Sequence, residues 1–135
     1  MRIVLDTNVL VSGAFFGGIP GRILQAWRDG KVQIVVSPQI LDEYREVLDE
    51  LGASRPGIDV RRLLDLLFVH GELVLGSVLP ERVCDDPDDD KFLVCAARAG
   101  ADCVVSGDKH LLKASGYRGV PVLTPRAFVD AHLHE

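Results

Sequence analysis

The sequence predicts an α/β sandwich built on an open, mainly parallel sheet. Short apolar runs, several of them rich in β-branched residues, alternate along the chain with segments of helical periodicity. Strands that alternate with helices are typical of parallel pairing through right-handed crossovers. The 135 residues, 47% hydrophobic and 26% charged, suffice for one domain with its own core. This pattern leaves the order of the strands in the sheet open.

Five short apolar runs are predicted to be buried strands. They are residues 3–5, 32–36, 73–75, 103–105 and 120–123. No internal repeat, low-complexity tract or linker divides the chain, so we expect one domain over residues 1–135. The stretch Gly-Ala-Ser-Arg-Pro-Gly at 52–57 is expected to be a loop between two helices.

Helix start signals lie between these runs. One helix is expected after Pro20, ending at Gly30. Ser37 followed by a proline is a typical N-cap with proline at the first helical position, and Thr124 repeats the arrangement. Residues 59–69 are mostly leucine, valine and phenylalanine, and we interpret them as a buried helix. The alternative is that one of its faces meets a second copy of the chain or another protein.

Composition excludes several classes of protein. No apolar run approaches the ~18–20 residues of a membrane span, and Asp6 interrupts the N-terminal run before a signal-peptide core forms, so no membrane association is predicted. The three cysteines, Cys84, Cys95 and Cys103, are odd in number and widely spaced, which indicates reduced thiols in a cytoplasmic protein. Twenty acids against fifteen bases leave a net charge of −5, which at first argues against a nucleic-acid partner.

Acidic residues recur just beyond the predicted strands. Asp6 ends the first strand and Asp108 follows the strand at 103–105, and ligands of open α/β sheets gather outside the carboxyl ends of strands. Either aspartate could instead cap the next helix. Glu43 lies in the first turns of the helix that Ser37 opens, bordering its apolar stripe, and its alternative role is that of an acid near a helix N-terminus.

The densest acidic signal is the run Asp-Asp-Pro-Asp-Asp-Asp that begins at Asp85. Asp86 before Pro87 is a good N-cap, but one cap needs one aspartate, and crowded like charges destabilise unless a cation binds. On a helical wheel Asp89 falls on the apolar face of the following helix, whereas Asp90 projects nearly opposite. An acid on a buried face needs a partner, so periodicity favours Asp89 over Asp90 as a metal ligand.

The joint placement of these acids predicts a metal site. The four members are Asp6, Glu43, Asp89 and Asp108. Because no histidine or cysteine is among them, zinc is disfavoured, and oxygen-only ligands suit Mg²⁺ or Mn²⁺. Such a cluster can hold one or two ions, activate a water and stabilise the leaving oxygen in phosphodiester cleavage.

Four sequence blocks now carry a resemblance. They are Leu-Asp-Thr-Asn-Val-Leu-Val-Ser at 5–12, Pro-Gln-Ile-Leu-Asp-Glu at 38–43, Asp-Pro-Asp-Asp-Asp-Lys-Phe-Leu at 86–93 and Val-Ser-Gly-Asp-Lys-His-Leu-Leu at 105–112. In this order, over nearly the whole chain, they resemble the PIN-domain ribonucleases, and most of all the VapC-like toxins of toxin–antitoxin pairs. The resemblance implies a three-layer sandwich whose central, twisted, mainly parallel sheet is flanked by helices, and a Mg²⁺- or Mn²⁺-dependent endoribonuclease.

The resemblance also assigns residues and partners. Asp6, Glu43, Asp89 and Asp108 become the catalytic metal site, and the supporting or outer-sphere residues are Asn8, Asp86, Asp90 and Ser106. The side chains next to the acids that could meet RNA phosphates are Lys91, Lys109 and His110, although solvated helix-end charges are their alternative interpretation. RNA is the implied substrate, a cognate antitoxin an implied partner, and a homodimer the implied assembly.

Three alternatives stay open at this point. The first is a PIN nuclease of RNA processing that is not a toxin, and the second is a non-catalytic PIN-like module that binds protein. The third is a receiver-like phospho-acceptor domain, which needs an aspartate at the end of a central strand. The net charge no longer opposes RNA, because the four proposed ligands and Asp90 account for the whole acidic excess.

Overall fold

The five strands pair in parallel into one sheet. The computed structural model describes residues 1–55, 57–75 and 89–133. The sheet has the order β3-β2-β1-β4-β5, and its strands are β1 (Arg2–Leu5), β2 (Gln33–Val36), β3 (Glu72–Leu73), β4 (Cys103–Val105) and β5 (Val122–Leu123). The predicted α/β class and parallel sheet are therefore confirmed, and the structure supplies the strand order, with β1 at the centre.

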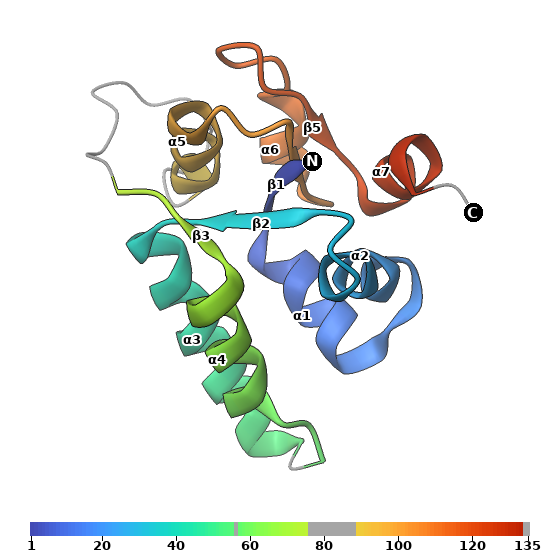
Figure 1. Cartoon of the computed structure of the whole chain (residues 1–135), viewed down its shortest axis with the longest axis vertical. Coiled ribbons are helices and arrows are strands. Elements are labelled where there is room, and N and C mark those ends of the chain that lie inside the picture. Colours follow the sequence, from blue (N-terminus) through green and yellow to red (C-terminus); the bar gives the residue numbers. More distant parts are fainter. Residues whose placement is uncertain (56, 76–88, 134–135) are drawn as a thin grey trace.

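Helices cover both faces of this sheet. They are α1 (Thr7–Phe16), α2 (Gly18–Arg28), α3 (Pro38–Ser54), α4 (Val60–His70), α5 (Asp90–Ala99), α6 (Lys109–Lys113) and α7 (Pro125–His132). Figure 1 shows α1 to α4 below the sheet and α5 and α6 above it, which gives three layers. The predicted caps are confirmed, because Ser37 Oγ accepts from Ile40 N at 3.2 Å and Thr124 Oγ1 accepts from Ala127 N at 3.1 Å.

The helices differ from the prediction at several points. An unpredicted helix, α1, begins directly after β1 and breaks at Gly17 (φ 73°), and α2 starts at Gly18, before the start expected after Pro20. The predicted loop at 52–57 was wrong for its first half, because α3 continues through Ser54. Gly52 lies inside this helix and lets the start of α4 pack close to it, since a Cβ there would lie 2.7 Å from Val60 Cγ2.

The last strand is shorter than predicted because a turn precedes it. Val120 N donates to Tyr117 O, and Val120 O accepts from Gly116 N, so Val120 belongs to the turn rather than to the sheet. Pro121 has no N–H to donate. The third strand likewise ends at Leu73, so the prediction that it extends to Leu75 was wrong.

Helix α4 confirms the helix expected at 59–69 and shows that only one of its faces is buried. Asp59 Oδ1 caps it by accepting from Arg62 N at 3.0 Å. Leu63, Leu64 and Leu67 are buried, whereas Phe68 and Val69 are 60% and 73% exposed. The apolar character of this segment thus combines a core stripe with an exposed end.

The core surrounds the central strands and fixes the position of the site. Ile3, Val4 and Leu5 of β1 and all three side chains of β4 are buried, as are Leu93 and Ala96 of α5, the helix that packs over these strands. Cys95 and Cys103 are free and buried, and burial raises the pKa of each thiol to about 12, so both are unreactive at neutral pH. Cys84 lies outside the described residues.

Within residues 1–55, 57–75 and 89–133 no single helix is both long and apolar enough to cross a bilayer. Helices α1 and α2 meet the length and composition only together, as a pair bent by 94°.

Candidate active site

The carboxyl ends of β1 and β4 bring the first and last acidic blocks together. These strands are neighbours, with Leu5 opposite Val105, and Asp6 N donates to Val105 O at 3.0 Å. The residues that follow each strand therefore lie side by side. Asp6 is 5% exposed, and Ser106 on the adjacent strand end is fully buried.

Ser106 connects the two aspartates. Its Oγ donates to Asp6 Oδ2 at 2.6 Å and accepts from Asp108 N at 2.9 Å. Asp108 Oδ1 accepts from His110 N at 2.7 Å, so Asp108 does cap α6, as the alternative interpretation expected. This cap uses one carboxylate oxygen of Asp108, Oδ1. Asp108 therefore caps α6 and also lies at the predicted metal site.

Glu43 reaches this site from α3. Thr7, the first residue of α1, donates from Oγ1 to Glu43 Oε2. The other oxygen, Oε1, lies 2.7 Å from Lys91 Nζ at the start of α5, and both side chains of this ion pair are partly buried. Glu43 is thus held at the junction of three elements, and Lys91 contacts an acid of the site.

The electrostatics of Asp6 show that these acids are close neighbours. The pKa of Asp6 is raised, first because burial removes water from the carboxylate, and also because Asp108 and Glu43 place negative charge nearby. Hydrogen bonds from Ser106 and from the backbone of Asn8 oppose this shift. The site therefore carries excess negative charge in a poorly hydrated place, an arrangement that a cation would stabilise.

Sequence reasoning missed two positioning residues. Tyr44, fully buried on α3, donates from its hydroxyl to Leu5 O at 2.5 Å and so anchors the residue before Asp6. Thr7, to which the sequence assigned no role at the site, orients Glu43 through a hydrogen bond from its hydroxyl. The available signals were a tyrosine, whose hydroxyl needs a partner when buried, next to Glu43, and a hydroxyl residue next to Asp6.

The third acidic block is only partly described. Asp89 immediately precedes α5 and its Oδ2 is buried, while Asp90 begins the helix; both residues are partly exposed. Lys91, one residue further, reaches Glu43, which places the start of α5 at the same end of the sheet. Asp86 lies outside the described residues, as does its predicted capping role. The choice between Asp89 and Asp90 as a ligand stays a prediction.

The acids do not yet form a closed coordination shell. Among the residues that the structure describes, no group of three or more His, Cys, Asp or Glu side chains is close enough to hold a metal ion. Both oxygens of Glu43 contact the chain's own groups, Thr7 and Lys91. A metal bound by Asp6, Asp108 and Glu43 together would therefore require side chains to reorient.

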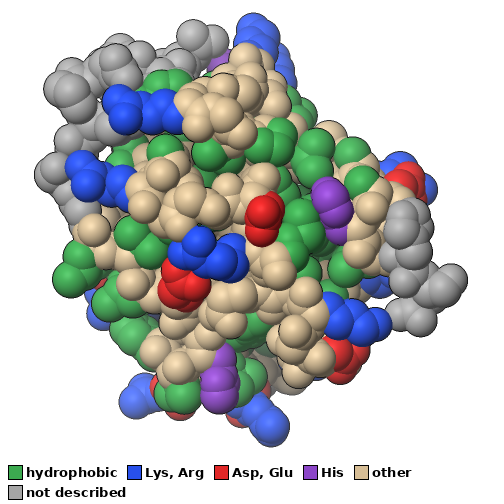
Figure 2. All heavy atoms as spheres, turned by 45° about the horizontal axis from the view of Figure 1, so that its top comes forward, with side chains coloured by type: hydrophobic (Ala, Val, Ile, Leu, Met, Phe, Trp, Pro, Cys, Tyr) green, Lys and Arg blue, Asp and Glu red, His purple; other side chains and the backbone are tan. Residues whose placement is uncertain are grey.

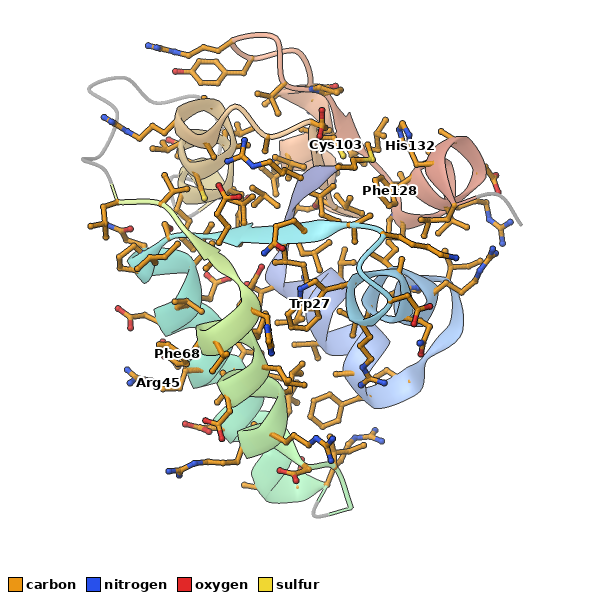
Figure 3. All side chains as sticks on the ribbon, in the orientation of Figure 1. Trp27, Arg45, Phe68, Cys103, Phe128 and His132 are labelled. Carbon is orange, nitrogen blue, oxygen red and sulfur yellow. The ribbon has the colours of Figure 1, made fainter. Side chains whose placement is uncertain are left out.

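A second feature is a hollow of about 1020 Å³ at the opposite end of the strands, where Met1 and Gln33 lie. Helices α2 and α4 form its walls, with apolar residues such as Leu63 and basic residues such as Arg28 and Arg62. Figure 3 shows Trp27, another lining residue, between these two helices. This hollow is separate from the acidic site.

Comparison with known proteins identifies the family. Residues 2–110 match the family model of the PIN domain. The chain belongs to the PIN domain family. An uncharacterized protein of Methanocaldococcus jannaschii is 30% identical over 115 residues, which span 83% of this chain and 74% of that protein.

A solved structure shares the PIN fold of this chain. The crystal structure of VapBC2 from Rickettsia felis, bound to a DNA fragment from their promoter, matches with a TM-score of 0.63 and 13% identity. The match covers 92% of this chain and 98% of the matched chain. The predicted resemblance and the predicted sandwich are both confirmed, and three of the four PIN sequence blocks fall wholly within described residues.

Proposed function

We propose that this PIN domain is a metal-dependent endoribonuclease that hydrolyses phosphodiester bonds of RNA and serves as the toxin of a toxin–antitoxin pair in the cytoplasm. The observation that supports this most is Asp6, a buried aspartate at the carboxyl end of the central strand, with Asp108 and Glu43 beside it. Buried carboxylates whose pKa is raised by burial and by like charges are typical of functional sites.

The donor set suits Mg²⁺ or Mn²⁺. Asp6, Glu43, Asp89 and Asp108 offer only carboxylate oxygens. Burial and, after it, the negative charges of Asp108 and Glu43 raise the pKa of Asp6, and a divalent cation would offset that charge. One or two ions would be held by these residues. When bound, such an ion supplies Lewis acidity, which makes a water more acidic and stabilises charge on the phosphate oxygens.

The chain's own residues position this chemistry. Ser106 holds the Asp6 carboxylate and the backbone of Asp108 in a fixed relation, which keeps both residues at the proposed site. Thr7 orients Glu43, which is placed either to complete the ligand set or to orient the attacking water. Lys109 and His110, which follow Asp108, are the proposed contacts to RNA phosphates.

Charge on the surface is mixed rather than concentrated. On the face drawn in Figure 2, basic and acidic side chains are interspersed and neither kind gathers into an extended patch. RNA binding would then depend on local contacts near the site and on neutralisation of the acids rather than on a broad basic surface. A cognate antitoxin is the proposed protein partner, and a homodimer is the proposed assembly.

The decisive experiment is an RNA cleavage assay on purified protein with Mn²⁺, with Mg²⁺ and with chelator. We expect cleavage only with metal, and Asp6→Asn and Asp108→Asn each to lose at least ~100-fold of the activity. Asp42→Asn is the matched control, because Asp42 adjoins Glu43 in sequence but is exposed. Full activity in both site variants would overturn the proposal.

Toxin and processing roles separate in cells. A toxin should arrest growth on expression in a bacterial host, and a small protein encoded beside it should relieve the arrest. A processing nuclease should cleave RNA in vitro without arresting growth. A non-catalytic module should do neither, and a receiver-like domain should instead be labelled by acetyl phosphate.

A further inference from the structure

Lys91 extends from α5 toward the acidic site and ends on an acid. Its Nζ lies 2.7 Å from Glu43 Oε1, and the two side chains are only 20% and 31% exposed. The same ammonium lies 5.1 Å from the centre of the Phe92 ring, a side chain that is itself buried. A carboxylate and an aromatic ring both attract a cation, so this position is built for a positive charge.

The pairing decides which atoms Glu43 can offer. Thr7 Oγ1 donates to one carboxylate oxygen, and Lys91 binds the other. A metal ion on Oε1 would stand next to the ammonium, and two cations that share one oxygen repel each other. The absence of a three-acid metal-holding group among residues 1–55, 57–75 and 89–133 agrees with this arrangement.

The acids also need a positive charge before any ligand arrives. Asp6 is buried with Asp108 and Glu43 nearby, and each of the two neighbours disfavours the ionised form of Asp6. An ammonium on Glu43 offsets one of the three negative charges. Lys91 and a divalent cation would thus each neutralise negative charge at the same carboxylate, that of Glu43.

We propose that Lys91 is a built-in counter-ion for Glu43 that exchanges with the divalent metal: it holds Glu43 until the ion binds and is then released. Lys91 is in this sense a positioning residue. When the metal ion binds, the ammonium group of Lys91 leaves Glu43. The inference rests on the proposed function, because it requires a divalent ion at the acidic site.

The exchange predicts a gain in metal affinity when the ammonium is removed. Lys91→Met should bind Mn²⁺ about two- to tenfold more tightly than the wild type in calorimetry, because a partly screened competing charge is lost. Lys91→Arg should stay near the wild-type affinity, because it keeps the charge. Lys113→Met is the matched control, since Lys113 is an exposed lysine on α6, and it should not change the affinity.

A second measurement uses the wild-type chain and does not depend on a variant that folds. Acetylation of lysines by a water-soluble N-hydroxysuccinimide ester, followed by peptide mass spectrometry, reports how accessible each amine is. Adding Mn²⁺ should raise the acetylation rate of Lys91 several-fold and leave that of Lys113 unchanged. In Asp6→Asn protein, where the metal site is weakened, the rise should disappear.

The outcomes separate this inference from the proposed function. Absence of Mn²⁺ binding by the wild type, or binding that Asp6→Asn does not weaken, would overturn both. Binding that depends on Asp6 but is unchanged or weaker in Lys91→Met would overturn the exchange alone, as would Lys91 acetylation that does not respond to metal.

Discussion

At the residue scale, single hydroxyl groups determine how the acids are presented. Ser106 donates to Asp6 and receives the amide of Asp108, and Thr7 donates to Glu43. Because Ser106 is fully buried, both of its hydrogen bonds are shielded from competing water. The acids are thus held by neutral donors, and their mutual repulsion stays largely uncompensated apart from the Lys91 ion pair.

That repulsion predicts a stability cost with a definite pH dependence. Because the pKa of Asp6 is raised in the folded state, folding favours the protonated form of Asp6. The contribution of Asp6 to the free energy of unfolding is therefore fully present below the ordinary aspartate pKa, and it is lost as the pH rises through the raised value. Metal-free Asp6→Asn protein should therefore melt at a higher temperature than the wild type at pH 7. The difference should shrink as the pH is lowered toward 4, because the raised pKa favours the protonated form of Asp6.

Thermal unfolding with chelator, followed by circular dichroism at both pH values, measures this effect. Asp42→Asn, at an exposed position, should leave the melting temperature nearly unchanged at either pH. A wild-type chain that is more stable than Asp6→Asn at pH 7 would show that ionised Asp6 is stabilised rather than strained.

At the element scale, close helix packing depends on glycines with defined neighbours. A Cβ on Gly13 of α1 would lie 2.9 Å from Leu24 Cδ1 and 2.9 Å from the carbonyl oxygen of Pro20, so α1 and α2 approach each other only because Gly13 has no side chain. Gly21 of α2 lies at the same helix contact, but a Cβ on Gly21 would be 3.6 Å from the nearest atom, the carbonyl oxygen of Gly13, which is an ordinary contact.

The same substitution should therefore have opposite effects at these two positions. Gly13→Ala should lower the free energy of unfolding by about 1–3 kcal/mol, because the backbone at Pro20 must move. Gly21→Ala should raise it by up to about 1 kcal/mol, because alanine is the better helix former and the space is free. Urea denaturation of the three proteins measures both, and a Gly13→Ala chain as stable as Gly21→Ala would contradict the packing.

At the scale of the whole molecule, the strand order brings acidic residues together at the carboxyl ends of β1 and β4. The strand order places β1 between β2 and β4, and the acids of distant blocks converge where β1 and β4 end. The net charge of −5 equals the number of acids given by the four proposed ligands and Asp90. The whole acidic excess can therefore be assigned to the proposed site.

Metal loading should consequently change RNA binding. The metal-free protein should bind a non-cleavable 2′-O-methyl RNA more weakly than the metal-loaded protein, because bound divalent ions offset the acidic charge that repels phosphates. Fluorescence anisotropy at constant ionic strength, with NaCl replacing MgCl₂, measures this difference. The gain should be smaller in Asp6→Asn protein, and equal RNA affinity in the two states of the wild type would refute the charge argument.

Much of the fold could be predicted because local signals agreed. Ser37 and Thr124 predicted the starts of α3 and α7, because each is an N-cap followed by proline. The apolar run at 103–105 has the same bounds as β4. The helix α1 escaped prediction because only Asp6 separates it from β1 and because its ten residues include a serine and a glycine, Ser12 and Gly13. The end of α3 was misplaced because glycine and serine, here Gly52 and Ser54, are typical of loops, although Gly52 lies inside α3 and packs closely against Val60 at the start of α4.

Family, fold class and candidate acids followed from the sequence alone, because the order of motifs and the alternation of strands and helices are properties of the chain itself. Only the tertiary structure decided which groups meet. Three contacts join residues that lie 36 to 48 positions apart in the sequence: Tyr44 with Leu5, Thr7 with Glu43, and Lys91 with Glu43. No local sequence pattern encodes them. Parallel strands joined by long crossovers bring such residues to one edge, so the partners of each acid are fixed by packing rather than by spacing.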